Sequence, residues 1–315
     1  MINYNYLIEH SNLFPSVIGI KYWRFKILLE KFSKELRKAE HQKAYSFERS
    51  RITGGGRKIS KSLNSDGKKL FFILFYYKTY PTFVLAQCLF ELDESNLLRW
   101  KVFLEKVLLN SIDYQLKLPE TKIRHLDQMM IICPNLKECL IDASERQVNR
   151  PKDSKTQKRY YSGKKKKHTV KNQILVNPRT RKILHVSKTV EGKKHDKKLA
   201  EEDPVWHKFP PGSLCLGDSG YQGLNETNNR VRVLTPKKKP KGKELTSSEK
   251  KNNTAISRIR TPVEHPFAFM KNFHILKNQF RGRIKQADIP FRTIACLYNF
   301  NLAYRYSPRK LNSSF

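Results

Sequence analysis

The chain has 315 residues, and its 63 Lys and Arg outnumber its 28 Asp and Glu to give a formal net charge of +35. Such an excess favours a polyanionic partner, either nucleic acid or an anionic membrane, and carries no information about the fold. Hydrophobic residues make up 38% of the chain and aromatic residues 11%, which excludes a disordered basic tail. We therefore expect a folded DNA-binding protein with one large and one small domain.

The sequence gives little support for a membrane protein or for a disulfide-bonded one. The most apolar run, residues 70–77, is far shorter than the roughly 20 residues that a spanning helix needs, so we expect a buried core helix there. The N-terminal residues lack the basic segment and small-residue cleavage site of a secretory signal. Five scattered cysteines without a CxxC pair predict ordinary buried thiols in a reduced, cytosolic compartment.

The first predicted element is an amphipathic helix over residues 21–43. Its apolar residues recur at helical spacing, with Lys, Arg and Glu between them: Phe25, Leu28, Leu29, Phe32 and Leu36. A basic glycine-rich loop follows at residues 53–58. Its glycines do not form a GxGxxG pattern, so a nucleotide cradle is not expected.

Two short helices are predicted between residues 80 and 108. Tyr80-Pro81-Thr82 would begin the first, with Pro in its first turn. After a polar break at residues 91–95, the second would run over 96–108. It would bury Leu97, Trp100, Leu104 and Val107 and expose Asn96, Arg99, Lys101 and Lys106. This layout is typical of a DNA-binding helix-turn-helix, with Arg99 and Lys101 facing DNA, although a structural three-helix bundle would show the same pattern.

The second half of the chain alternates strands and helices. Asn177-Pro178-Arg179-Thr180 is a strong turn signal that predicts an antiparallel hairpin around it. Asp142 and Asp218 each follow a short apolar run, so both should lie at strand ends. We expect strands at 136–141, 169–176, 183–190, 214–217 and 230–235, and helices around Glu264 and over 287–304. This order predicts a mixed α/β fold.

A lysine-dense segment lies between the last strand and the helix of Glu264. Residues 236–254 hold few apolar residues, so we expect a mobile basic loop. Seven lysines fall within 237–251, among them Lys237, Lys238 and Lys239. The segment could be a solvated loop or an arm that contacts DNA phosphates.

Three acidic residues in this basic chain suggest metal chemistry. Hard cations such as Mg²⁺ take oxygen ligands and keep several waters, so one or two carboxylates suffice for each ion. Two ions roughly 4 Å apart can activate an attacking oxygen and stabilise the leaving one. Asp142, Asp218 and Glu264, converging from separate elements, could hold two such ions, Mg²⁺ or Mn²⁺. A strand-end aspartate taken alone is more often a cap or a turn residue.

The order of motifs between about 138 and 276 resembles the DDE-type insertion-sequence transposases, most closely the IS5-like group. The motifs are IDASERQVNRPKD, YYSGKKKKHTVKNQILV, EGKKHDKKLAEE, GDSGYQG and RIRTPVEHPFAFMK. Upstream, GGGRK, YPTFVLAQCLF and NLLRW are similar to that family's helix-turn-helix segment. The resemblance therefore covers most of the chain.

This resemblance implies a ribonuclease-H-like catalytic domain over 133–315 and a helical DNA-binding domain over 1–132. It makes Asp142, Asp218 and Glu264 the catalytic and metal-binding triad. The family's last motif is Tyr, two residues, Arg, three, Glu, six, Lys. Arg260, Glu264 and Lys271 fit this spacing, whereas Ser257 stands where Tyr is often found. Arg260 and Lys271 would contact DNA phosphates from one side of a helix.

Several neighbouring residues have both a structural and a functional interpretation. Lys164, Lys165, Lys166, Lys167 and His168 form either a solvated turn or a contact to the DNA backbone. Asp196 is expected mainly as a helix N-cap, with metal or phosphate proximity as the alternative. Glu145 is a rival ligand expected to face away from the site. Tyr160 and Tyr161 could stack on a frayed base or pack in the core.

The functional expectation is a transposase that cleaves DNA at the inverted repeats of its element and joins the 3′-hydroxyl end to target DNA. The family scheme uses double-stranded DNA, no covalent protein–DNA intermediate, and at least a homodimer when assembled on DNA. It implies a bacterial cytoplasmic, nucleoid-associated protein. The alternatives are a catalytically inactive or co-opted DNA-binding protein and a nuclease without strand transfer.

Overall fold

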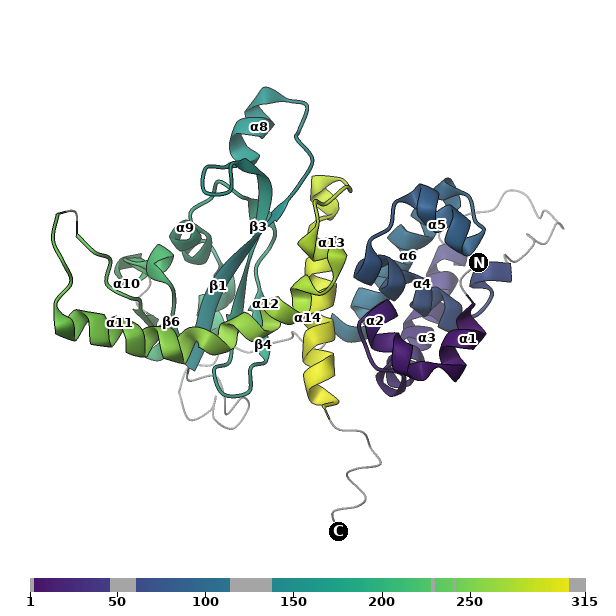
Figure 1. Cartoon of the computed structure of the whole chain (residues 1–315), viewed down its shortest axis with the longest axis horizontal. Helices are drawn as coiled ribbons and strands as arrows, with labels where there is room; N and C mark the ends of the chain where they lie inside the picture. The colour runs from purple at the N-terminus through teal and green to yellow at the C-terminus, as the bar shows by residue number, and fades with distance from the viewer. Residues whose placement is uncertain (1–2, 46–60, 114–137, 228–229, 241, 306–315) are drawn as a thin grey trace, which may run out of the picture. The chain divides into compact units, whose positions relative to one another are not determined.

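The computed structural model describes residues 3–45, 61–113, 138–227, 230–240 and 242–305 (Figure 1). It contains two compact units. Unit 1 comprises residues 1–115, 272–277 and 292–315, and unit 2 comprises 116–271 and 278–291. The loop predicted at 53–58, Cys133 and the domain boundary expected at 132/133 lie outside the described residues, and that boundary stays a prediction.

Unit 1 is helical. The amphipathic helix predicted over 21–43 is confirmed as α3, whose residues Phe25, Leu28, Phe32 and Leu36 are at most 1% exposed. The apolar run at 70–77 is confirmed as the buried centre of α4. The helices are α1 (Tyr4–Glu9), α2 (Phe14–Ile18), α3 (Tyr22–Tyr45), α4 (Asp66–Thr79), α5 (Phe83–Phe90), α6 (Glu94–Ile112), α13 (His274–Lys277) and the later part of α14 (Asp288–Ala303).

The two helices and the break predicted between residues 80 and 108 are present as α5 and α6. Thr82 caps α5 by accepting a hydrogen bond from the Leu85 amide at 3.2 Å. Pro81 therefore precedes the helix instead of occupying its first turn. Glu91 ends α5 in the left-handed region at φ 51°, which turns the chain sharply into α6.

Lys101 is not exposed as the sequence predicted. It is 5% exposed, and its Nζ lies 2.7 Å from Oε2 of Glu105, one turn further along α6. The charge is tolerated inside unit 1 because this carboxylate neutralises it. Arg99 and Lys106 are exposed as expected, whereas Trp100 is only half-buried.

Unit 2 is built on a mixed sheet with strand order β2-β3-β1-β6-β7, in which β4 and β5 both pair with β3. β1 runs antiparallel to β3 and parallel to β6. The strands are β1 (Glu138–Gln147), β2 (Tyr161–Ser162), β3 (Lys167–Val176), β4 (Ile183–Val186), β5 (Val190–Glu191), β6 (Ser213–Leu216) and β7 (Val231–Leu234).

The predicted hairpin is confirmed as β3 and β4. Asn177 shapes its turn because its side-chain oxygen accepts hydrogen bonds from the amides of Arg179 and Thr180. β1 is longer than predicted, since it continues from Asp142 to Gln147 along β3. Asp142 therefore lies inside β1 and not at its end.

One face of the sheet packs against helices through a cluster of buried apolar side chains. The helices are α9 (Asp196–Glu201) and α10 (Leu224–Thr227), with the short 3-10 turns η4 (Pro204–Lys208) and η5 (Ser219–Tyr221). The cluster includes Cys139, Ile141, Leu175, Ala200, Trp206, Phe209, Cys215, Tyr221 and Leu224. Cys139 and Cys215, which are paired across β1 and β6, both belong to this cluster.

Residues 247–260 form helix α11 (Ser247–Arg260), so the basic loop is shorter than the predicted 236–254. A capping box starts the helix: the Glu249 amide donates to Thr246, and the Thr246 amide donates to Glu249. None of its side chains is buried, which is why apolar periodicity does not reveal it. The turn η6 (Thr261–Val263) and helix α12 (Glu264–Lys271) follow.

The predicted fold class is confirmed. Unit 2 is a mixed α/β domain of the kind expected for a ribonuclease-H-like core, and the N-terminal region is helical. Among the described residues, no helix has both the length and the apolar character that crossing a membrane requires.

Candidate active site

Asp142 in β1 and Asp218 just after β6 stand at matching distances from a pair of residues on two neighbouring parallel strands. Leu140 of β1 pairs with Leu216 of β6, and each aspartate follows its leucine by two residues. Parallel strands run in the same direction, so both carboxylates come to the same edge of the β1–β6 pair. The structure therefore brings these two predicted residues together.

Asp218 also has a local structural role. It is the N-cap of η5, and its Oδ1 accepts a hydrogen bond from the Gly220 amide at 2.8 Å. This bond uses one carboxylate oxygen and fixes the side chain. The cap role and the site role are compatible, because a carboxylate carries two acceptor oxygens.

Asp142 is held in an environment that disfavours its negative charge. Burial raises the pKa of Asp142 to about 6, and the nearby carboxylates of Asp218 and Asp196 add to this rise. The Ala143 amide, which donates to Oδ1 at 2.8 Å, and the charge of Arg260 oppose it. A bound cation would relieve this electrostatic cost.

We expect Asp142→Asn to stabilise the metal-free protein at neutral pH. The ordinary pKa of 3.8 rises to about 6 on folding, so stability falls as the pH rises through this window. Above it, the ionised carboxylate costs about 3 kcal/mol, which asparagine avoids. Melting temperatures in EDTA should therefore differ more between variant and wild type at about pH 8 than at about pH 5. Equal differences at both pH values would contradict the buried-charge explanation.

Asp196 lies at the same site, and its predicted role as an N-cap is wrong. His195 is the N-cap of α9, without a side-chain capping bond, and Asp196 is the first helical residue. Its Oδ1 is instead paired with Nζ of the buried Lys171 at 2.8 Å. The side chain turns toward the sheet because a buried lysine needs a compensating charge.

Glu264 comes from a different element than the two aspartates. It begins α12 and is exposed, although the preceding turn η6 packs against β1. Within the described ranges, no three His, Cys, Asp or Glu side chains are grouped closely enough to hold one metal ion. The place of Glu264 in a catalytic triad stays a prediction.

Arg260 and Lys271 do not share one helix side, because Pro262 in η6 separates α11 from α12. Arg260 is half-buried, its Nε is shielded from solvent, and its charge acts on Asp142. Lys271 is exposed and lies over the ring of Phe267, 5.9 Å from its centroid. Only Lys271 therefore has the exposed position predicted for a phosphate contact.

The lysines of the turn before β3 and of its first residue are exposed, as a contact to the DNA backbone requires. Lys164, Lys165, Lys166 and Lys167 are all exposed, and His168 is half-buried. Exposed Tyr161 on β2 packs edge-on against His168, with ring centroids 5.6 Å apart. These residues form a basic and aromatic edge of unit 2.

The lysines that follow β7 are partly neutralised. Lys237 pairs with Glu249, and Lys239 pairs with Glu244. The Lys237 amide also donates to the Asn253 side chain at 2.8 Å, which ties this segment to α11. Lys238 is exposed.

The remaining predictions have mixed outcomes. Glu145 accepts a hydrogen bond from Thr169 at 2.8 Å and lies 3.6 Å from Lys171, so its carboxylate is already engaged.

Among the described cysteines, Cys139, Cys215 and Cys296 are buried as expected. Cys88 on α5 is exposed, contrary to the prediction.

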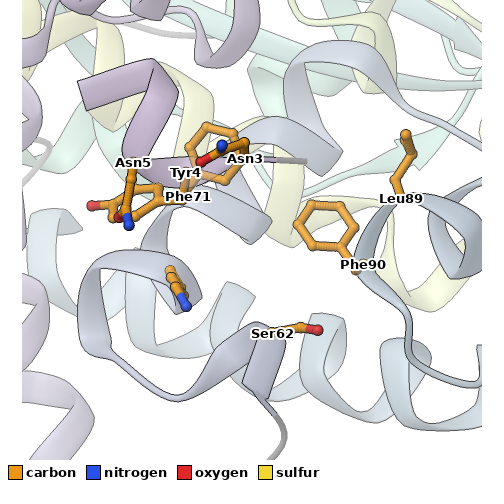
Figure 2. Close-up of a pocket in the computed structure, with 8 residues that line it drawn as sticks. Asn3, Tyr4, Asn5, Ser62, Phe71, Leu89 and Phe90 are labelled. Carbon is orange, nitrogen blue, oxygen red and sulfur yellow. The ribbon is translucent and has the colours of Figure 1, made fainter. Parts of the chain in front are cut away.

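Unit 1 contains a cavity of about 370 Å³ that is separate from these carboxylates (Figure 2). Its lining is apolar and amide-rich and contains no carboxylate: Asn3, Tyr4, Asn5, Ser62, Lys68, Phe71, Leu89 and Phe90. It therefore offers no carboxylate ligand for a metal ion. The strand edge of unit 2 is therefore the candidate active site.

Comparison with known proteins shows the family to which the chain belongs. The sequence model of the protein family described as "DDE superfamily endonuclease" matches residues 141–299 of this chain. A Microchaete diplosiphon protein named "Probable transposase for insertion sequence element IS702" is 30% identical over 233 residues, covering 74% of this chain and 79% of that protein. A Streptomyces albus G relative, named for the transposase of element IS112, is 26% identical over 114 residues, covering 36% and 41%. No solved structure matches significantly. The chain belongs to the DDE superfamily of endonucleases, within the insertion-sequence transposases.

Proposed function

We propose that this protein cleaves DNA at the ends of its mobile element in a metal-dependent reaction and joins the freed 3′-hydroxyl to target DNA. The observation that carries the proposal is that Asp142 and Asp218 each follow, by two residues, one member of the Leu140–Leu216 pair that aligns the parallel strands β1 and β6. Family membership and the net charge of +35 support a DNA substrate.

The donor set fits divalent metal ions such as Mg²⁺ or Mn²⁺. Asp142 and Asp218 supply hard oxygen ligands, and two carboxylates suffice for an ion that keeps several waters. Burial, with a smaller contribution from the nearby carboxylates, raises the pKa of Asp142, and a bound cation would oppose this rise. Asp142 and Asp218 would hold the ions, with Glu264 contributing from α12. When bound, a pair of such ions would supply activation of the attacking oxygen and charge stabilisation of the leaving oxygen.

The basic residues of unit 2 bind and orient the DNA. Lys164 to Lys167 present four exposed charges on one turn, and Lys238 and Lys271 add exposed charge elsewhere. Lysine contacts to phosphates position a duplex without reading its sequence. Base reading falls to the helix-turn-helix formed by α5 and α6, with Arg99 exposed on the second helix. Pairing two element ends calls for a homodimer on DNA.

The test is cleavage of a labelled duplex that carries the inverted repeats flanking the gene. Wild type with Mg²⁺ should cut at the repeat ends, and EDTA should abolish cutting. Asp142→Ala, Asp218→Ala and Glu264→Ala should each lose cleavage and retain binding. A second duplex then reports whether the 3′-hydroxyl ends are joined to it.

The outcomes separate the competing functions. Tight, salt-sensitive binding with no cutting under Mg²⁺ or Mn²⁺ would indicate a DNA-binding relic. Cleavage without joining would indicate a nuclease. Cleavage that survives in Glu264→Ala but not in the two aspartate variants would remove Glu264 from the triad.

A further inference from the structure

The hairpin formed by β2 and β3 has an ordered and strongly basic turn. Tyr161 pairs with His168 across the two strands, and Ser162 pairs with Lys167. Ser162 is buried, and its hydroxyl oxygen accepts a hydrogen bond from the Lys165 amide at 3.2 Å, which closes the turn. Four consecutive lysines, residues 164–167, are exposed along it. The hairpin therefore holds a dense cluster of positive charge in a defined position.

Tyr161 adds an exposed aromatic ring at the base of this turn. The residue is 44% exposed, whereas the preceding Tyr160 is half-buried. The rings of Tyr161 and His168 meet edge to face, with their planes at 70° and their centroids 5.6 Å apart. Because they are not stacked face to face, their contact does not cover both ring faces. An open aromatic face beside positive charge is a surface on which a nucleobase can stack.

Tyr161 and His168 lie on the same face of the sheet as Asp142. Directly opposed residues of an antiparallel pair share a face, and so do alternate residues of one strand. Asp142 is opposite Ile174, and His168 precedes Ile174 by six residues on β3. At about 3.4 Å per residue, the aromatic pair lies roughly 20 Å along the strand from Asp142. This length corresponds to about six nucleotides of duplex DNA.

The charges around Tyr161 suit a polyanion. Helix α8 (Ser154–Tyr160), which ends next to Tyr161, exposes Lys155, Lys158 and Arg159. Glu191 of β5 lies 3.6 Å from Arg159 and partly neutralises it, so the lysines carry most of the charge. Lysines bind the phosphates of double and single strands alike. An exposed tyrosine face can stack only on an unpaired base, because paired bases are already stacked within the duplex.

We propose that Tyr161, packed against His168, is a stacking platform for an unpaired DNA base, while the lysines of residues 164–167 bind the phosphates of the same strand. This inference rests on the proposed function, because it assigns the surface to the DNA that the protein cleaves. Unpaired bases become available where a duplex frays next to a cut. The platform holds such a base and keeps its strand from pairing again.

The test is binding of two duplexes to the full chain in EDTA, so that no cleavage occurs. One carries the element end fully paired, and the other carries the same end with an unpaired tail that holds 2-aminopurine at successive positions. Wild type should prefer the tailed duplex and quench the 2-aminopurine fluorescence. Tyr161→Leu should lose the quenching and bind the tailed duplex about fivefold or more weakly, the low end for one base stacked on an aromatic ring. Its affinity for the paired duplex should not change.

Three further variants control this result. Tyr161→Phe should behave as wild type, because the ring and not the hydroxyl stacks. Tyr6→Leu is the matched control: Tyr6 is 48% exposed and also packs on a histidine, but its ring is stacked on that of His10 at 4.0 Å. The sequence has no Lys or Arg within residues 3–14, so this variant should bind both duplexes normally. Lys164→Gln should weaken both duplexes alike.

The outcomes separate the platform from the proposed function. Equal binding of the two duplexes by wild type, or quenching that survives in Tyr161→Leu, would overturn the inference and leave the proposed cleavage intact. If Tyr161→Leu weakened both duplexes equally at an unchanged melting temperature, Tyr161 would contact the duplex backbone and the inference would again be wrong. If wild type bound neither duplex, the proposed function would fail together with the inference.

Discussion

Asp218→Asn should lower metal-dependent cleavage of element ends by about a thousandfold or more, while DNA affinity stays the same or rises. Removing one carboxylate ligand weakens the charge stabilisation on which an in-line displacement depends. Asparagine keeps an oxygen that can accept the Gly220 hydrogen bond, so the cap of η5 is preserved. The lost negative charge also reduces repulsion of the DNA phosphates. Single-turnover cleavage with Mg²⁺ and a salt-controlled binding titration measure the two effects.

Asp153→Asn is the matched control for this charge change. Asp153 is exposed and caps α8 (Ser154–Tyr160) by accepting from the Thr156 amide, a role that asparagine also fills. It should cleave as wild type does. If Asp218→Asn instead lost DNA binding while each bound complex still cleaved at the normal rate, Asp218 would be a DNA-contacting residue and not a catalytic one.

Apolar runs and turn chemistry predicted the elements that carry the two aspartates. The hairpin turn at Asn177 and the short strand before Asp218 needed only local signals. The length of β1 could not be predicted in the same way, because its second half is polar and is held by pairing to β3. Whether a polar segment becomes a strand is decided by its neighbour in the sheet.

The carboxylate partners at the site depend on tertiary contacts. Asp196 stands at the start of a helical segment, a context typical of an N-cap, and nothing local shows that Lys171 would reach it. Tyr221 lies three residues after Asp218, but its burial follows from the cluster between α9 and the sheet. The order of the motifs was enough to indicate the family. The side chains that surround the two aspartates could be identified only from the structure.

The helical periodicity of α6 indicated that Lys101 is buried, but the preference of lysine for the surface suggested the opposite. Lys101 is spaced at four residues from Leu97 and three from Leu104, so helical periodicity alone places it on the buried face. Lysine was expected outside because lysines are almost never fully buried unless paired. The pair is Glu105, four residues later, which is also the spacing of an ordinary surface ion pair.

Lys101→Met should destabilise unit 1 by about 3–5 kcal/mol, the usual cost of leaving one member of a buried ion pair without its partner. Glu105 would keep only the Tyr77 hydroxyl, which donates to Oε2 at 3.3 Å, since its Oε1 already has no hydrogen-bond partner. Burial already raises the pKa of Glu105 despite the opposing charge of Lys101. Losing Lys101 should raise this pKa further. Urea denaturation followed by circular dichroism measures the change.

Two further variants decide between a structural and a DNA-binding Lys101. Lys106→Met alters an exposed lysine on the same helix and should change stability by no more than about 0.5 kcal/mol. Lys101→Met with Glu105→Leu should recover most of the loss, because an apolar pair can replace a buried ion pair. If Lys101→Met instead kept full stability and weakened DNA binding, Lys101 would act at the DNA surface. A high positive charge attracts DNA to the protein as a whole, but burial determines which lysines can touch it.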